Sequence, residues 1–306
     1  MVIKTNKDKL MRQALMGKIA PPTMPGGGTR STYVTTWDGK PKIGIGVGGI
    51  KYNVKMGDPC LGWPETEYLE PGVALTGVDE KADVGYRDVS GTGTAFLKYC
   101  CVGNVATVVS GSGKGATGFI TGKGGVGGTR RHVLVHFKGE DLEKLDIGDK
   151  VRVASDGVAL EVEGFDGKVF NVSPSFLEAL KPELDGDVLE LPVAKEIPVI
   201  AMGMGVGGGS ADTGGWCIQT SPPHLVEKLG LGDLRIGDLV ACRDALMAFG
   251  KGFYRGAVTV GIVTTGESHV AGEGPNVMAI ASSKRGKIRP RLNPLANVAK
   301  YLGLEG

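Results

Sequence analysis

A polar loop in the last quarter of the chain carries the residue types most suited to chemistry. It follows an apolar run at 257–263 that predicts a strand, and it places Glu267, His269 and Glu273 within seven residues. Loops at strand ends carry functional side chains more often than core positions do. An imidazole close to carboxylates can act as an acid–base group or bind a divalent cation. We therefore take these three as candidate catalytic residues, with a solvated polar turn as the competing interpretation.

Three further residues extend this hypothesis to a metal site. Asp212 lies in a glycine-rich loop, Asp238 follows a Gly-Asp turn, and His132 begins a predicted strand. With His269 they are the candidate ligands for a divalent metal such as zinc, magnesium or manganese. At a rise of about 3.3 Å per residue, His132 and His136 are too far apart on a strand to hold one ion together. The metal hypothesis therefore requires His132, Asp212 and His269 to converge from distant elements.

A glycine-rich stretch at 123–129, KGGVGGT, resembles the phosphate loop of ParA-type ATPases. Gly128 stands where that loop has its phosphate-binding lysine, and the chain continues into a predicted strand instead of a helix. The three G-x-G-x-x-G matches in this sequence also lack a following helix, so we expect no nucleotide cofactor. Backbone N–H groups beside cations can still bind an anion. The candidate anion site is Lys123, Gly124, Gly125 and Arg130, with a plain turn as the alternative.

The elements that must position these residues are mostly strands. Turn residues separate short β-branched runs, without the regular strand–helix alternation of a parallel doubly wound sheet. The fold class expected is α+β, predominantly β, with glycine-rich barrel-like or sandwich sheets and a few short helices. The clearest expected elements are an opening helix from Asn6 to Gly17, a hairpin over 104–121, a strand over 132–137, helices after Ser173-Pro174 and Ser221-Pro222, and a last helix over 295–302.

Two pairs of segments repeat one another. LDIGDKVRV at 145–153 is similar to LRIGDLVAC at 234–242, and GIGVGG at 44–49 is similar to GMGVGG at 203–208. The two offsets disagree, so we interpret them as recurrent turns and not as proof of duplication. Chain length favours two domains. We place a β-rich N-terminal domain at 1–125 and a β-rich C-terminal domain with short helices at 126–306.

Composition limits the classes of function. The 306 residues include 52 glycines and carry a net charge of +2, which is too balanced to recruit nucleic acid or a membrane surface. No apolar run approaches the roughly 18 residues of a membrane helix, and no secretory signal is present, so we expect a cytoplasmic protein. Five cysteines without a C-x-x-C pair are expected to be buried thiols. Five cations at 284–291 without aromatic residues favour a solvated face or a subunit contact, and we expect a homo-oligomer.

Two resemblances bear on function. The stretches 121–125, 132–135, 234–241 and 271–275 resemble an uncharacterised prokaryotic family of β-rich proteins, a domain-of-unknown-function family that implies no activity. Separately, GESHVA at 266–271 with Glu273-Gly274 is similar to the GDGHAA…GDGE segment of acetamidase/formamidase enzymes, and GGSADT at 208–213 is similar to their GGNxDT run. This second resemblance implies a metal-assisted hydrolase of small amides, with His269, Glu267 and Asp212 at the matching positions. The chain departs from it at Glu267, at Ser268 and in a one-residue contraction before Glu273.

The sequence thus leads to two hypotheses of different class. The first is a metal-assisted hydrolase of a small amide-like metabolite, in which a divalent ion activates water. The second is a non-catalytic protein that binds a small molecule or anion, or serves in assembly.

Overall fold

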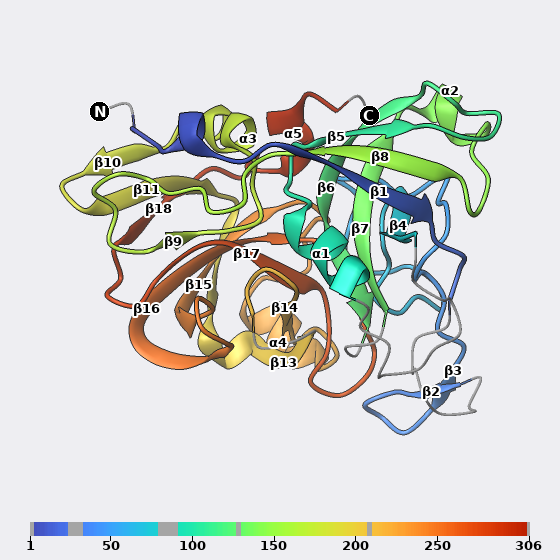
Figure 1. Ribbon diagram of the computed structural model, residues 1–306. Helices are drawn as coiled ribbons and strands as arrows, with labels where there is room; N and C mark the ends of the chain where they lie inside the picture. Colours follow the sequence, from blue (N-terminus) through green and yellow to red (C-terminus); the bar gives the residue numbers. More distant parts are fainter. Residues whose placement is uncertain (1–2, 24–32, 79–90, 127–129, 207–209, 305–306) are drawn as a thin grey trace.

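A closed barrel forms the first half of the molecule. The computed structural model describes residues 3–23, 33–78, 91–126, 130–206 and 210–304. Six strands pair antiparallel around the barrel in the order β1-β4-β7-β6-β5-β8 (Figure 1). Their bounds are β1 Gln13–Ile19, β4 Val73–Gly77, β5 Val105–Val108, β6 Thr117–Val126, β7 Arg130–Phe137 and β8 Lys150–Ser155. Alternate residues of β8, such as Val151 and Val153, are buried, as expected for a strand with one face on a core.

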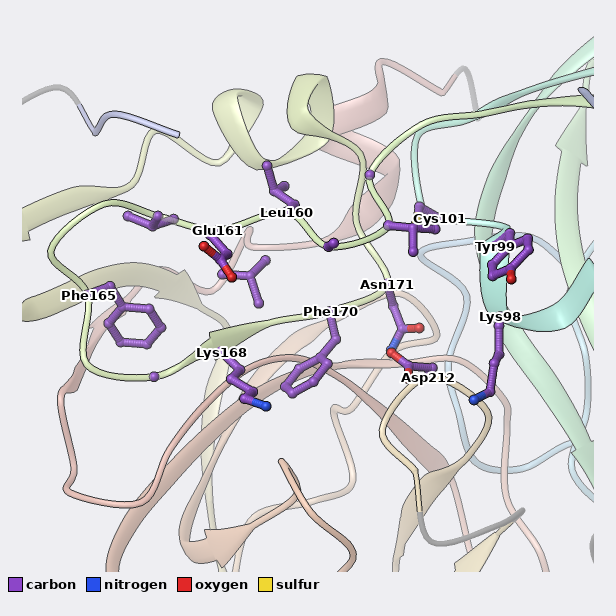
Figure 2. A pocket seen from close by; sticks show the side chains of 16 residues that line it. Lys98, Tyr99, Cys101, Leu160, Glu161, Phe165, Lys168, Phe170, Asn171 and Asp212 are labelled. Carbon is purple, nitrogen blue, oxygen red and sulfur yellow. The ribbon is translucent and has the colours of Figure 1, made fainter. Parts of the chain in front are cut away.

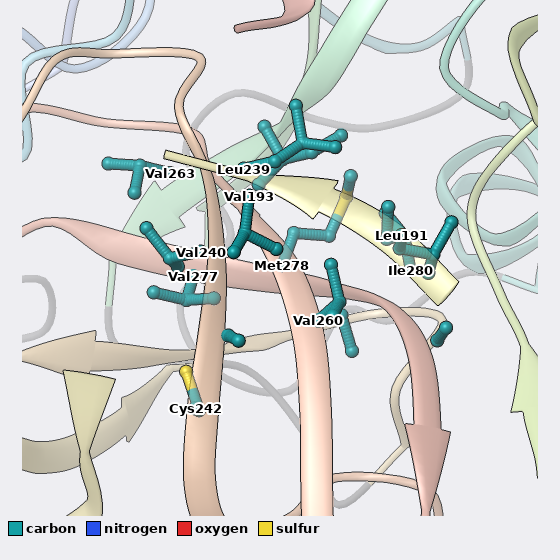
Figure 3. Packing of buried hydrophobic residues seen from close by; sticks show 14 of the residues in the cluster. Leu191, Val193, Leu239, Val240, Cys242, Val260, Val263, Val277, Met278 and Ile280 are labelled. Carbon is teal, nitrogen blue, oxygen red and sulfur yellow. The ribbon is translucent and has the colours of Figure 1, made fainter. Parts of the chain in front are cut away.

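A larger sheet forms the second half. Its strands follow the order β12-β15-β16-β17-β14-β13, and β9 adds to β17. Their bounds are β9 Lys168–Val169, β12 Lys195–Pro198, β13 Met202–Val206, β14 Gly215–Ile218, β15 Leu239–Leu246, β16 Gly252–Val263 and β17 Asn276–Ser283. Figure 3 shows how Leu191 and Val193 from a neighbouring strand lie over this sheet, against residues such as Val240 and Met278. All four side chains are buried, so this contact is part of the main apolar core.

Smaller elements complete the fold. A three-stranded sheet pairs β10 (Glu183–Asp185), β11 (Val188–Val193) and β18 (Ile288–Leu292), and a two-stranded ribbon pairs β2 (Val34–Thr35) with β3 (Pro41–Lys42). The α-helices are α1 Gly91–Tyr99, α2 Gly139–Leu142, α3 Pro174–Ala179, α4 Pro223–Lys228 and α5 Val298–Leu302, and the 3-10 turns are η1 Lys7–Lys9 and η2 Val199–Ala201. The described residues contain no helix long and apolar enough to cross a membrane. The predicted β-rich α+β class is confirmed.

Most predicted elements are present, but the opening helix is wrong. The hairpin β5–β6, the strand β7 and the helix α3, whose N-cap Ser173 accepts a hydrogen bond from Phe176 N, are as expected. Instead of a helix from Asn6 to Gly17, η1 is followed by β1. β1 pairs with both β4 and β8, so it closes the barrel, and this pairing outweighs the helical spacing of its apolar residues.

The two Gly-Asp segments form the same turn, one in each half. Gly148 and Gly237 both have φ +92°, where a side chain would be strained. The carboxylate of Asp149 accepts a hydrogen bond from Asp146 N at 3.0 Å, and Asp238 accepts one from Arg235 N at the same distance. Each turn leads directly into a strand, β8 or β15. The interpretation as a recurrent turn is confirmed.

The strand orders of the two halves also correspond. Read from β5, the barrel runs β5-β8-β1-β4-β7-β6, and the second sheet runs β12-β15-β16-β17-β14-β13. The equivalents of β1 and β4 are β16 and β17, which come last in the second half instead of first. The two orders are therefore related by a circular permutation. Two pairings differ. β12 is parallel to β15 whereas β5 is antiparallel to β8, and β5 pairs with β6 to close the barrel whereas β12 and β13 are not paired in the described residues.

The barrel extends beyond the boundary predicted near residue 125. That position lies inside β6, and the barrel closes only when β7 and β8, which ends at Ser155, are added. A boundary within β6 would separate hydrogen-bonded neighbours of one closed sheet. The barrel therefore includes residues on both sides of position 125.

Candidate functional site

The centre of the candidate site is a short segment at 65–70, ETEYLE, that lies between the two halves of the fold. Its backbone pairs with the glycine-rich stretch before it, through Glu67 N to Ile45 O and Glu70 N to Gly46 O, both within 3.0 Å. On its other side Tyr68 N donates to Glu267 O at 2.8 Å. Glu67 and Glu70 are both completely buried. A buried carboxylate is costly unless it is paired, and each of these two is paired with a histidine.

Glu67 belongs to the first of these clusters, the His269 cluster, which consists of Lys42, Glu67, Glu267 and His269. The backbone N–H of His269 donates to both carboxylate oxygens of Glu67, at 3.0 and 3.2 Å. Lys42 Nζ lies 2.5 Å from Nδ1 of the same histidine and 3.9 Å from Glu67 Oε1. The Lys42 side chain is 9% exposed, whereas that of His269 is 34% exposed. The buried carboxylate thus fixes the loop and neutralises the lysine, while the imidazole reaches solvent.

Glu267 approaches the imidazole at Nε2, which lies 3.3 Å from Lys42 Nζ. Its Oε1 accepts hydrogen bonds from the backbone N–H groups of Gly62, at 2.7 Å, and Trp63, at 3.2 Å. Its Oε2 is 3.8 Å from Nε2 of His269. The side chain is therefore held by one oxygen and presents the other to the ring. Two of the three predicted catalytic residues, Glu267 and His269, are brought together.

Glu273 has a separate environment. It accepts a hydrogen bond from Ser268 Oγ at 3.3 Å and also bonds with Tyr68. Burial raises the pKa of Glu273 above its ordinary value, against the hydrogen bonds from Tyr68 and Ser268. Tyr68 in turn accepts a weak hydrogen bond from the thiol of Cys217. Glu273 therefore supports the loop from its buried side and is not in contact with the imidazole.

The second cluster, the His132 cluster, consists of Lys51, Glu70 and His132. Glu70 Oε2 lies 2.8 Å from Nδ1 of His132 and accepts a hydrogen bond from Gly48 N at 2.7 Å. Burial opposes ionisation of Glu70, but His132, Lys51 and this N–H together hold its pKa below the ordinary value. Burial also lowers the pKa of Lys51, whose Nζ donates to Gly48 O. A lysine, a glutamate and a histidine thus recur as a group within one connected region.

The four predicted metal ligands are not gathered in one place. His132 faces Glu70 and His269 faces Lys42, as described above. Asp238 pairs with Arg235 at 3.0 Å and accepts a hydrogen bond from Asn297 at 2.9 Å. Across the ranges that the structure describes, no three His, Cys, Asp or Glu side chains form a group that could hold an ion. At His269 a metal on Nδ1 would also meet the ammonium of Lys42. The residues therefore do not fit the metal expected from the sequence.

Asp212, the remaining predicted ligand, lies beside a cavity of about 580 Å³ next to the end of α1. Figure 2 shows Asp212 and Asn171 side by side on its wall, with Lys98 near them. The buried Lys123 ammonium donates to Asp212 O at 2.8 Å and to Asn171 Oδ1 at 2.7 Å. Lys123 thus joins the barrel to the second half. Neither His132 nor His269 is among the residues that line this cavity.

Two residues of the predicted anion site, Lys123 and Gly124, face groups inside the protein. The Lys123 ammonium is used inside the protein, and a Cβ at Gly124 would overlap with the carboxylate of Glu70. An anion at Gly124 would meet that negative charge. Residues 127–129 and the side chain of Arg130 lie outside the described part of the structure. The glycine at 124 instead makes room for the buried acid of the His132 cluster.

Sequence reasoning missed Lys42, Lys51, Glu67 and Glu70. The available signal was the pair of acids three residues apart in a segment rich in apolar residues, close to the glycines at 44–49. Glutamates are usually exposed to solvent, so their spacing alone did not indicate that Glu67 and Glu70 are buried.

The fold and these clusters define a β-rich protein with two related halves, in which the segment at 65–70 pairs one buried glutamate with a histidine of each half. Family models described as "Domain of unknown function (DUF4438)", N-terminal and C-terminal, match residues 33–178 and 180–302. The chain belongs to this DUF4438 family, so the expected membership of an uncharacterised family is confirmed. A solved structure titled "Crystal structure of TM1086" is 36% identical over 97% of this chain and 98% of that one, with a TM-score of 0.84. Comparison with curated proteins found no match.

Proposed function

We propose that this protein is a hydrolase that cleaves a C–N bond of a small amide-like metabolite by acid–base catalysis at the His269 cluster. The observation that supports this most directly is the contact of 2.5 Å between Lys42 Nζ and Nδ1 of a partly exposed His269. An ammonium that donates to Nδ1 leaves the ring proton on Nε2. A neutral imidazole with a proton on Nε2 can polarise a carbonyl group or protonate a leaving amine.

Glu267 supplies the complementary base in this proposal. Its Oε1 is occupied by two backbone N–H groups, whereas Oε2 lies near Nε2 of His269. In the proposed reaction Oε2 takes a proton from the attacking water, whose oxygen bonds to the amide carbon. The C–N bond then breaks as the leaving nitrogen takes the proton from Nε2 and Nδ1 takes one from Lys42. Glu267 Oε2 afterwards returns the proton taken from water to Nε2, and Nδ1 returns its proton to Lys42, so that all three groups recover their starting state. Glu67 holds both Lys42 and the backbone of His269 in place.

The proposed reaction does not use a metal at His269. Lys42 occupies the side of the ring where an ion would bind, and a second cation there would be repelled. The amide-like substrate class rests on the resemblance of residues 266–274 to a segment of acetamidase/formamidase enzymes.

The proposal is tested by measuring ammonia release from formamide, acetamide and other primary amides. We expect His269→Ala and Lys42→Met to lower the rate by about 10²–10⁴-fold, the usual contribution of a positioned acid or base. His224→Ala is the matched control, because His224 is exposed on α4, and it should retain the full rate. Dialysis against EDTA should also leave the rate unchanged. Absence of ammonia release from every amide, or equal rates for wild type and His269→Ala, would refute the proposed function.

A further inference from the structure

A second cavity, of about 200 Å³, lies at the end of the barrel near α2. Its lining comes from the chain before β4, from the end of β7 and from α2, which Figure 1 shows grouped at one side of the barrel. The lining carries four basic side chains, Lys51, Lys55, His136 and Lys138, together with Tyr52. Among the described residues that form this lining there is no aspartate or glutamate. We call this group the cationic cavity.

The positive charge of the cationic cavity is not neutralised from within. Lys51 is directed to Gly48 O, and the nearby acid Glu70 is already paired with His132. Lys55 and Lys138 are exposed, and the described part of the chain offers neither side chain an ion-pair partner. Burial lowers the pKa of His136, and the charge on Lys55 lowers it further. Several like charges at one place repel one another, and an anion would relieve this repulsion.

We propose that the cationic cavity is a binding site for a small oxyanion, such as inorganic phosphate or the phosphate group of a small metabolite. Its volume is below the roughly 300–1,000 Å³ of sites for drug-sized ligands, which favours a group of few atoms. Lysine ammonium groups are suitable donors for phosphate oxygens, and the N–H of a neutral imidazole can add a hydrogen bond. The cavity differs from the predicted loop at 123–130 and does not include any residue of the His269 cluster.

Binding is tested by titrating the full-length protein with inorganic phosphate at constant ionic strength, with chloride as the balancing salt. Calorimetry gives the Kd, and the NMR signal of the His136 ring gives its pKa. We expect phosphate to raise the pKa of His136, because a bound anion favours the charged imidazole. A phosphate monoester titrated in parallel distinguishes the two sources: tighter binding of the monoester indicates a phosphorylated metabolite, whereas tighter binding of inorganic phosphate indicates the free ion.

The matched variants are Lys55→Ala/Lys138→Ala and Lys9→Ala/Lys114→Ala. All four lysines are exposed, so both double variants should fold, and both remove two positive charges. The first should weaken phosphate binding about tenfold or more, through loss of two charge-assisted contacts, whereas the second should bind as wild type does. The inference is overturned if wild type binds no phosphate, if the two double variants behave alike, or if the pKa of His136 does not move. None of these outcomes bears on ammonia release at the His269 cluster.

Discussion

Two buried glutamates, Glu67 and Glu70, decide the chemistry of the candidate site. Removing a carboxylate from water costs several kcal/mol, and only a partner of opposite charge or several hydrogen-bond donors offset this cost. Glu67 has the backbone N–H of His269 and the ammonium of Lys42, and Glu70 has His132 and the backbone N–H of Gly48. Each acid therefore holds a histidine or its loop in one position, as a catalytic or binding group requires.

We expect Glu70→Gln to destabilise the protein by about 1–3 kcal/mol at pH 7, because the variant leaves charged and polar groups around position 70 imperfectly paired. The effect should depend on pH. Folding lowers the pKa of Glu70, so the charged carboxylate stabilises the folded protein. This contribution is fully present above about pH 4.3, the pKa of glutamate in the unfolded chain, and it is lost as the pH falls through the lower pKa of the folded state. The difference in free energy of unfolding between wild type and Glu70→Gln should therefore become smaller below about pH 4.

Urea unfolding at a series of pH values measures this difference. Glu163→Gln is the control, because Glu163 is exposed, and its stability should follow that of wild type at every pH. A constant difference between wild type and Glu70→Gln from pH 7 to acid would show that Glu70 is not charged in the folded protein.

At the scale of elements, the recurrent Gly-Asp turn begins one central strand in each half. In both copies the aspartate accepts the N–H three residues before it, and the backbone N–H and C=O groups of the turn also bond with a neighbouring strand. Ile19 exchanges hydrogen bonds with Gly148 and Asp149, and Val263 does the same with Gly237 and Asp238. The turn thus fixes the register of β8 on β1 and of β15 on β16.

We expect Asp149→Ala and Asp238→Ala to destabilise the protein by similar amounts, about 1–3 kcal/mol, because each leaves a turn N–H and other donors without their acceptor. Thermal and urea unfolding measure the change. Asp233→Ala is the control, since Asp233 is exposed and pairs with Lys195 at the surface, and it should cost about 1 kcal/mol or less. If either turn variant is as stable as this control, the turn does not contribute to the fold as inferred.

Turn residues, β-branched runs and helix caps in the sequence predicted the strands and helices that depend on local signals. The hairpin β5–β6 follows from β-branched runs on either side of a glycine-rich turn, and α3 follows from its Ser173-Pro174 cap. The opening helix failed because β1 is determined by pairing with β4 and β8, which are distant in sequence. A spacing of apolar residues that fits a helix could not reveal these partners.

The candidate site was predictable only in part, for the same reason. His269 and Glu267 are close in sequence, and the structure brings them together. Their other partners, Lys42 and Glu67, are 227 and 202 residues away from His269 in the sequence. The pair formed by Glu70 and His132 is likewise non-local. Side chains that meet through tertiary packing leave no fixed spacing in the sequence.

At the scale of the whole molecule, Lys123 links the barrel to the second half. It extends from β6 and donates to Asn171 and Asp212, both outside the barrel. Burial lowers the pKa of Lys123, so the position of this ammonium is costly, and its hydrogen bonds offset the cost. The two halves are therefore joined by a polar contact as well as by apolar packing.

We expect Lys123→Met to lower the stability by about 1–3 kcal/mol, because the buried Asn171 Oδ1 and the partly buried Asp212 O lose their donor. The shift should appear in the urea midpoint followed by tryptophan fluorescence. Lys114→Met is the control, since Lys114 is exposed, and its midpoint should match wild type within error. A Lys123→Met protein that is more stable than wild type would mean that the burial cost exceeds the value of the two hydrogen bonds.

The five cysteines are free and buried, as expected from the sequence, and they are distributed over both halves. Burial raises the pKa of Cys101 to about 11 and that of Cys242 to about 12, so both thiols are protonated at neutral pH. An alkylating reagent reacts with exposed thiolates and can reach these sulfur atoms only when the surrounding structure opens. The order in which the cysteines become modified therefore records which half of the native protein opens first, without any added label.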